Sequence, residues 1–283
     1  MIPITPGGQA AVTAAMEDVL VRLHLGSLDG GDQALELAVA HALVRRAGAG
    51  ELGEVLRIYR PSAPVAVFGR RDTRLPGFAA AAEAAATAGF EPLVRATGGR
   101  AVAYTGNALV VDHVAHEPDA MGAHDRRFER FGSLFAEALG RLGVDARVGA
   151  VPGEYCPGAH SVNARGTVKL VGTAQRVIKN AWLFSSLVIV GDEDRLQPVL
   201  ERVYGHLGLP FDGASVGSLT GEAPALDVQA VERALLGAYG ADASSAEGPD
   251  PDTLSLAHDL VDQHRVRPRG ARRGGADDAS GSS

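Results

Sequence analysis

Cysteine and lysine are almost absent from the sequence. Cys156 is the only cysteine, which excludes an intramolecular disulfide and leaves too few thiolates for a zinc site. Lys169 and Lys179 are the only lysines among 27 basic residues, and the rest are arginines. A bias in codon composition explains most of this skew. The three rare residues are therefore the first candidates for a specific role.

Positive charge and long apolar runs are also scarce. The formal net charge of −7 at pH 7 excludes bulk nucleic-acid binding, which requires a basic surface. The most membrane-like stretch, residues 181–190, is interrupted by two serines and is far too short to cross a bilayer. The first six residues lack the basic start and apolar run of a signal peptide. We therefore expect a soluble cytoplasmic protein with neither a nucleic-acid nor a membrane partner.

Hydrophobic periodicity predicts helices and strands in alternating groups. The expected helices cover residues 32–46, 78–87, 128–142, 192–207, 227–239 and 253–264. The expected strands cover residues 55–59, 65–68, 92–95, 100–104, 108–113, 159–163, 167–176 and 182–190. Because the strands arrive in hairpin-like clusters between helices, we expect an α/β (α+β) fold with a mixed, mainly antiparallel sheet flanked by helices.

The same pattern suggests one globular domain with two loose ends. Residues 1–30 are expected to form a loose N-terminal arm, in which residues 11–23 could form a short helix. Residues 31–265 are expected to form the folded domain. Residues 266–283 are rich in arginine, glycine, aspartate and serine, which predicts a disordered tail.

Two motifs that suggest a ligand are better explained by local structure. Residues 48–53 match G-x-G-x-x-G, but they follow a helix and precede a strand, the reverse of the order in nucleotide-binding folds. This motif predicts a helix end and a turn. His113, His116 and His124 are interleaved with Asp112 and other acids, but their spacing matches no rigid pair of metal ligands. We expect a polar loop after a strand there, and no bound metal.

The first candidate site is the segment Arg-Ala-Thr-Gly-Gly-Arg-Ala-Val-Ala-Tyr at residues 95–104. Gly98 and Gly99 lie between two predicted strands and let backbone amides approach a ligand closely, because no Cβ intervenes. Arg95 and Arg100 flank this turn and could hold a carboxylate, a phosphate or an acidic carrier protein. An ordinary Gly-Gly hairpin in an arginine-rich protein explains these residues equally well.

The second candidate is Cys156, within Glu-Tyr-Cys-Pro-Gly-Ala-His at residues 154–160. It lies on a Pro/Gly turn just before a strand, a place that tends to expose a side chain to a cleft. A lone cysteine is more often a small buried apolar residue than a nucleophile. His160, and Lys169 across the predicted hairpin, favour the nucleophile, because a nearby cation increases the thiolate fraction.

The third candidate is Lys169, within the predicted strand at residues 167–176. Strand alternation places Lys169 and Val171 on one face of the sheet. A charged residue inside an apolar strand lies at an edge, in water or in a site. Because arginine serves for solvation elsewhere in this chain, a lysine here indicates a need for the compact ammonium itself. Gly172 permits close approach of the backbone.

Together these segments resemble the lipoate-protein ligase and octanoyltransferase family, which also contains the biotin ligases. Residues 95–104 match the family motif Arg-Arg-x-x-Gly-Gly-Gly-Ala-Val-x-His, with Arg100 for the third glycine and Tyr104 for the histidine. Residues 167–176 match Gly-x-Lys-x-x-Gly-x-Ala-Gln-Arg, with the first glycine one place early. The resemblance covers residues 32–225 and implies a fold of the biotin/lipoate protein ligase type.

The segment Tyr-Cys-Pro-Gly at residues 155–158 resembles the amidotransferase branch, which moves octanoyl groups between carrier proteins through a cysteine thioester. The resemblance implies that Cys156 is the nucleophile, and that Lys169 positions the acyl carbonyl and favours the thiolate. It also implies an acyl tunnel and backbone donors near the carbonyl oxygen. The residues implied for substrate binding are Arg95, Thr97, Gly98, Gly99, Arg100, Ala101, Tyr104, Gly172, Thr173 and Ala174.

The implied activity is transfer of an octanoyl or lipoyl group from a carrier protein to a lysine of a lipoyl-domain protein, without a cofactor. The implied partners are lipoyl-domain proteins, namely the acyltransferase subunits of 2-oxoacid dehydrogenases and the glycine cleavage H protein. The arginines at positions 70–71 and 95–100 are candidate docking residues for these acidic domains. Two alternatives stay open: an ATP- and Mg²⁺-dependent lipoate–protein ligase in which Lys169 binds an acyl-adenylate, and a non-catalytic relative that binds lipoyl domains.

Overall fold

The computed structural model describes residues 21–266. Most of the expected N-terminal arm and nearly all of the expected tail, residues 1–20 and 267–283, lie outside the described residues.

The chain alternates helices with groups of strands. The helices are α1 (Gln33–Gly48), α2 (Phe78–Thr87), α3 (His124–Arg141), α4 (Glu193–Leu207), α5 (Leu219–Glu222), α6 (Val228–Tyr239) and α7 (Pro251–Leu260). The strands are β1 (Arg22–Leu25), β2 (Val55–Tyr59), β3 (Val65–Phe68), β4 (Glu91–Val94), β5 (Val102–Tyr104), β6 (Ala108–His116), β7 (Ala146–Val148), β8 (Val162–Ala164), β9 (Val168–Ile178) and β10 (Ala181–Ile189).

The strands form two sheets. A larger sheet has the order β1-β2-β6-β10-β9-β8-β7, and a smaller one has the order β4-β3-β5. Within residues 21–266, the pairs β1–β2 and β3–β4 are parallel and the other pairs of these sheets are antiparallel. The mixed, mainly antiparallel sheet predicted from the sequence is confirmed.

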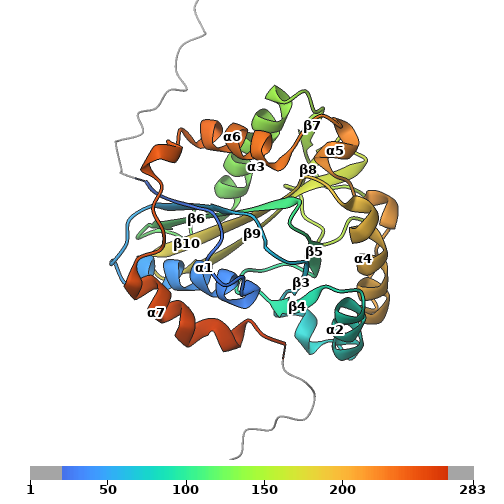
Figure 1. Ribbon diagram of the computed structural model, residues 1–283, viewed down its shortest axis with the longest axis horizontal. Helices are drawn as coiled ribbons and strands as arrows, with labels where there is room; N and C mark the ends of the chain where they lie inside the picture. Colours follow the sequence, from blue (N-terminus) through green and yellow to red (C-terminus); the bar gives the residue numbers. More distant parts are fainter. Residues whose placement is uncertain (1–20, 267–283) are drawn as a thin grey trace, which may run out of the picture.

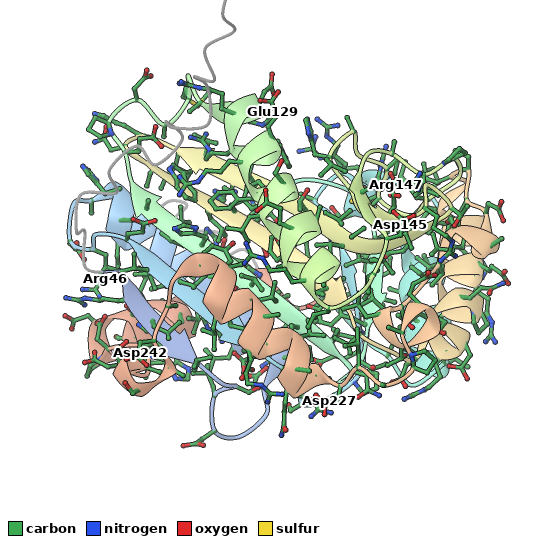
Figure 2. The ribbon with its side chains drawn as sticks, turned by 90° about the horizontal axis from the view of Figure 1, so that it is seen from above. Arg46, Glu129, Asp145, Arg147, Asp227 and Asp242 are labelled. Carbon is green, nitrogen blue, oxygen red and sulfur yellow. The ribbon has the colours of Figure 1, made fainter. Side chains whose placement is uncertain are left out.

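Helices cover both faces of the larger sheet. α1 and α7 lie on one face and α3 and α6 on the other, while α2, α4 and the smaller sheet lie at one end (Figure 1). Figure 2 shows α3, which carries Glu129, beside α6, which begins after Asp227. Each of these three groups of elements contributes to its own cluster of buried apolar side chains: one lies between α1, α7 and the larger sheet, one between α3, α6 and the larger sheet, and one around α2, α4 and the smaller sheet. The two sheets meet where the smaller one packs at the end of the larger, and this boundary holds the candidate site.

Local sequence signals account for the bounds of several elements. α1 begins after Asp32, whose carboxylate accepts hydrogen bonds from the N–H groups of Ala34 and Leu35. It ends at Gly48, so residues 48–53 are a helix end and a turn, as predicted. β2, β3 and α2 have the predicted bounds to the residue.

Two expectations are wrong. The N-terminal arm is not loose up to residue 30, and no helix reaches residue 23, because Arg22–Leu25 form β1 beside β2 and bury Leu23. The segment after His113 is not a polar loop, because backbone pairing with β10 continues β6 to His116.

Within residues 21–266, no helix has both the length and the apolar character that crossing a bilayer requires.

Candidate active site

The three segments predicted as a site come together around the sulfur of Cys156. The backbone N–H of Arg100 donates to Sγ at 3.2 Å, and the Nη2 group of Arg95 lies 3.6 Å from the same atom. Arg95 follows β4 and Arg100 precedes β5, so both donors belong to the smaller sheet. Hydrogen bonds from a guanidinium and a backbone amide stabilise negative charge on sulfur, which suits a cysteine nucleophile.

Gly99 permits this close approach. Its φ of +94° lies in the left-handed region, and an added Cβ would fall 2.6 Å from both Sγ of Cys156 and Nη2 of Arg95. The neighbouring Gly98 has an open surrounding, its carbonyl accepts from Nε of Arg95, and its N–H donates to the carbonyl of Gln175 at 3.4 Å. Of the two motif glycines, Gly99 is therefore the one that must lack a side chain for the sulfur to occupy its position.

The backbone of Cys156 is held in an unusual conformation. Its φ of 44° is in the left-handed region, which costs free energy for a residue with a side chain. Its N–H donates to the hydroxyl of Tyr204 at 2.6 Å, and that hydroxyl donates to the carbonyl of Ala101 at 2.9 Å. Burial raises the pKa of Tyr204 far above its usual value, so the hydroxyl keeps its proton. Tyr204 thus joins α4 to two segments: residues 154–158, called the cysteine loop below, and the glycine-rich residues 95–104.

Lys169 supports the cysteine loop by binding its backbone carbonyls. Its side chain is 1% exposed, and its ammonium donates to the carbonyls of Tyr155 at 2.9 Å and Cys156 at 2.8 Å. It also forms an ion pair of 2.9 Å with the buried carboxylate of Glu154. The other carboxylate oxygen of Glu154 accepts from the N–H of Gly158 at 3.1 Å, so the loop wraps around this pair.

The position of Lys169 differs from the one the resemblance implied, because its ammonium binds the backbone of residues 155–156 and lies neither beside the thiol nor in the lining of the cavity described below. The ammonium contacts the carbonyl oxygen of Cys156, whereas Sγ faces Arg95 and Arg100. The side chain of His160 turns away from the sulfur and stacks on Phe128, with ring centroids 5.5 Å apart. The cation beside the thiol is therefore the guanidinium of Arg95.

Arg95 and Arg100 are fixed by neighbouring carbonyls and by a buried acid. Arg95 donates to the carbonyls of Val67 at 3.0 Å and Arg100 at 2.5 Å. Arg100, which replaces the third motif glycine, sends its side chain to Asp72 at 3.1 Å and its backbone N–H to the sulfur. Asp72 also accepts from the N–H of Gly69 at 2.9 Å. The motif position filled by Arg100 therefore still supplies a backbone donor.

A cavity opens beside the sulfur and runs between α1 and the larger sheet. Seven of the predicted site residues line it: Arg95, Thr97, Tyr104, Cys156, Gly172, Thr173 and Ala174. The other lining residues are Leu37, Ala40, Val67, Ala96, Val102, Val110, Asp112, Leu183, Ser185, Ser186 and Leu187. Gly98, Gly99, Arg100, Ala101 and Lys169 are not part of the lining, and hold the cysteine loop and the glycine turn instead. A cavity lined by many apolar side chains suits an acyl chain.

Sequence reasoning missed three residues of the site. Glu154 and Asp72 are acids that are buried only because each has a specific cationic partner. Tyr204 lies four residues after Leu200, so the helical spacing that placed Leu200 inward also places Tyr204 on that face. Only the signal for Tyr204 was visible in the sequence.

Arg70 and Arg71, the other candidate docking residues, are exposed. Within the described residues, no group of three or more histidine, cysteine or acidic side chains is arranged to hold a metal ion.

Comparisons with known proteins identify the family. The family described as "Lipoyl protein ligase A/B catalytic domain" matches residues 32–240. The octanoyl-[GcvH]:protein N-octanoyltransferase of Geobacillus kaustophilus (strain HTA426) is 27% identical over 190 residues, which cover 67% of this chain and 66% of the relative. Enzymes of the same name from Exiguobacterium and Anoxybacillus flavithermus match over 45% and 52% of their lengths. The chain thus spans two thirds or less of the length of these curated relatives.

Solved structures show the same fold at lower identity. A lipoate-protein ligase A bound with ATP is 20% identical, with a TM-score of 0.64 over 86% of this chain and 94% of the other. The bipartite lipoate protein ligase of Thermoplasma acidophilum, described together with its E2 lipoyl domain, is also 20% identical, with a TM-score of 0.63 over 86% and 93%. The fold predicted from the resemblance is confirmed, and the chain belongs to the lipoyl protein ligase A/B catalytic domain family.

Proposed function

We propose that this protein is an acyltransferase that moves an octanoyl or lipoyl group from a donor carrier protein to Cys156 and then to a lysine of a lipoyl-domain protein. The observation that carries this proposal is the sulfur of Cys156, which lies at a largely apolar cavity and accepts from the N–H of Arg100 at 3.2 Å. The names of the curated relatives support the octanoyl group and the H protein of glycine cleavage.

In the first half-reaction, the thiolate of Cys156 attacks the carbonyl carbon of the donor's acyl group. A sulfur–carbon bond forms, the bond from that carbon to the donor's heteroatom breaks, and the departing group takes up a proton. Arg95 and the N–H of Arg100 stabilise the negative sulfur before attack. Gly172, Thr173 and Ala174, which line the cavity, are the proposed contacts of the acyl carbonyl.

In the second half-reaction, the neutral amine of the acceptor lysine attacks the thioester carbon. A carbon–nitrogen bond forms, the carbon–sulfur bond breaks, the thiolate of Cys156 returns, and the amine loses a proton to solvent. Lys169 and Glu154 keep the loop in place through both steps, because their ion pair holds the carbonyl and N–H groups of residues 155–158. This chemistry needs neither ATP nor a metal.

The proposed partners are lipoyl-domain proteins, namely acyltransferase subunits of 2-oxoacid dehydrogenases and the glycine cleavage H protein. The exposed Arg70 and Arg71 are the proposed contacts of an acidic acceptor domain. We place the reaction in the cytoplasm, because a nucleophilic thiol such as that of Cys156 stays reduced there.

The test is the covalent intermediate. The protein is incubated with an octanoylated carrier and analysed by intact mass spectrometry, with and without ATP and Mg²⁺. We expect an octanoyl adduct that forms without ATP, is released by hydroxylamine and is absent from Cys156→Ala. Modification of a lipoyl domain from free lipoate that requires ATP and persists in Cys156→Ala would support the ligase instead.

A further inference from the structure

A row of polar side chains crosses the larger sheet beneath α1. Strand register pairs Arg57 of β2 with Asp112 of β6, and Asp112 with Ser185 of β10. Ser185 in turn pairs with Ala174 of β9, beside the proposed position of the acyl carbonyl. The residues on either side of the row are apolar: Val110 and Leu187 toward the smaller sheet, and Val114 and Leu183 on the other side. A polar row in this setting requires its own explanation.

The charges in this row do not balance. The guanidinium of Arg57 donates to both the carboxylate and the carbonyl oxygen of Glu36 on α1. The other carboxylate oxygen of Glu36 accepts from the N–H of Leu28 at 2.7 Å. Asp112 is thus a second buried acid beside one guanidinium, and its Oδ2 lies 3.7 Å from Nη1 of Arg57, beyond hydrogen-bonding distance. The Arg57–Glu36 pair is complete without Asp112.

Asp112 contributes an unpaired oxygen to the cavity. The residue is 2% exposed, it lines the cavity, and its Oδ2 has no hydrogen-bond partner among residues 21–266. Burial raises its pKa, and the charge of Arg57 and a hydrogen bond from the Ser185 side chain to the carboxylate oppose this rise. A buried carboxyl oxygen that accepts no hydrogen bond is unfavourable, and a donor from a ligand would remove that cost.

The position of Asp112 indicates which part of a ligand would reach it. Cys156 is half-buried at the loops, whereas Asp112 lies in a central strand covered by α1, whose Leu37 and Ala40 line the same cavity. An acyl group bound through its carbonyl near Cys156 therefore extends along the cavity toward Asp112. Its distal carbons, and any group they carry, approach the unpaired oxygen.

We propose that the cavity selects a medium-chain acyl group that carries a hydroxyl toward its distal end, with Asp112 as the hydrogen-bond acceptor. This inference rests on the proposed acyltransferase function and assigns its substrate class. A plain octanoyl chain leaves Oδ2 unpaired, whereas a hydroxyl can donate to it. A thiol at the same place is a weaker donor, so a reduced lipoyl group satisfies Asp112 less well.

A competition experiment tests this preference. Wild-type protein is mixed with equal amounts of an octanoyl carrier and a 6-, 7- or 8-hydroxyoctanoyl carrier, and the two Cys156 adducts are resolved by mass. We expect the hydroxyoctanoyl adduct to exceed the octanoyl adduct for at least one isomer. In Asp112→Leu the hydroxyoctanoyl share should fall at least tenfold, while Asp112→Asn, which keeps an acceptor oxygen, should stay within threefold of wild type. Asp259→Leu, an exposed site on α7, is the matched control.

Each other outcome has a defined meaning. An octanoyl adduct that equals or exceeds the hydroxyoctanoyl adduct for all three isomers in the wild type would overturn the proposal, as would an unchanged ratio in a folded Asp112→Leu. If Asp112→Leu does not fold, the wild-type competition and Asp112→Asn decide. If no acyl carrier gives an adduct, the proposed function has failed, and calorimetry with free 8-hydroxyoctanoate and octanoate still tests the cavity. Tighter binding of octanoate there would overturn the preference.

Discussion

The ammonium of Lys169 lies 2.9 Å from the carboxylate of Glu154, and water is excluded from both side chains. Because the same two groups bind the backbone on either side of Cys156, the pair fixes the position of the cysteine loop. The pair therefore couples the stability of the fold to the reactivity of the sulfur.

Replacing Lys169 by methionine should be strongly destabilising. The change leaves the carboxylate of Glu154 buried without a cation, which costs about 3–5 kcal/mol. Adding Glu154→Gln should restore part of that stability but not the rate of adduct formation. Urea unfolding and acylation kinetics measure the two effects. Lys179→Met, at the exposed turn between β9 and β10, is the control for loss of a lysine. Full acylation by Lys169→Met would contradict a role in holding the loop.

Replacing Gly99 by alanine should slow adduct formation at least a hundredfold. The new Cβ would fall 2.6 Å from Sγ of Cys156, so the sulfur must leave its hydrogen bonds. Gly89→Ala separates this contact from backbone strain, because Gly89 has a similar φ of +81° and nothing near its Cβ position. Both variants should lose stability, and only Gly99→Ala should lose reactivity toward an octanoyl carrier. Equal rates of adduct formation in the two variants would show that the contact between the new Cβ and Sγ of Cys156 does not cause the slower reaction.

Replacing Tyr204 by phenylalanine should cost about 1–3 kcal/mol of stability, because the N–H of Cys156 and the carbonyl of Ala101 lose their shared partner. We also expect slower adduct formation. Tyr239→Phe is a matched control, since its buried hydroxyl has no hydrogen-bond partner in the described part of the chain. Chemical denaturation compares the two variants, and a Tyr239→Phe loss as large as that of Tyr204→Phe would refute the assignment.

A histidine pair should make the protein sensitive to acid. Nδ1 of His41 lies 3.3 Å from Nε2 of His264, whose Nδ1 donates to the carbonyl of Val94 at 2.8 Å. Burial and the charge of His264 lower the pKa of His41 to about 3. Burial lowers the pKa of His264 to about 4. From pH 6.5 down to about 4, the unfolded chain therefore binds protons that the folded chain does not.

The free energy of unfolding should fall through that window and change little from this cause above pH 6.5. The expected loss is about 1–2 kcal/mol per histidine between pH 7 and pH 5. Urea titrations at the two pH values measure it. His264→Gln should show a smaller drop, and His258→Gln, at an exposed position, should behave as wild type. The same drop in all three proteins would place the acid sensitivity elsewhere.

The sequence predicted elements far better than contacts. β2, β3 and α2 were predicted to the residue, because alternation, turns and an alanine-rich run are local signals. β1 was missed, since four residues at a sheet edge carry too short a pattern. The segments around Cys156, Arg100 among them, were identified through motifs, but the contact between Arg100 and the sulfur was not. Arg100 is 56 positions away, and only the packing of the two sheets brings its N–H to Sγ.

The site occupies the joint between the two sheets. Arg95 and Arg100 are attached to strands of the smaller sheet, whereas Lys169 is part of the larger one and carries the cysteine loop. A thioester on Cys156 with its chain in the cavity would touch both sheets and α1 at once. Acyl loading would then act as an internal cross-link, so that the protein carrying its cargo would be its more rigid form and discharge would free the joint.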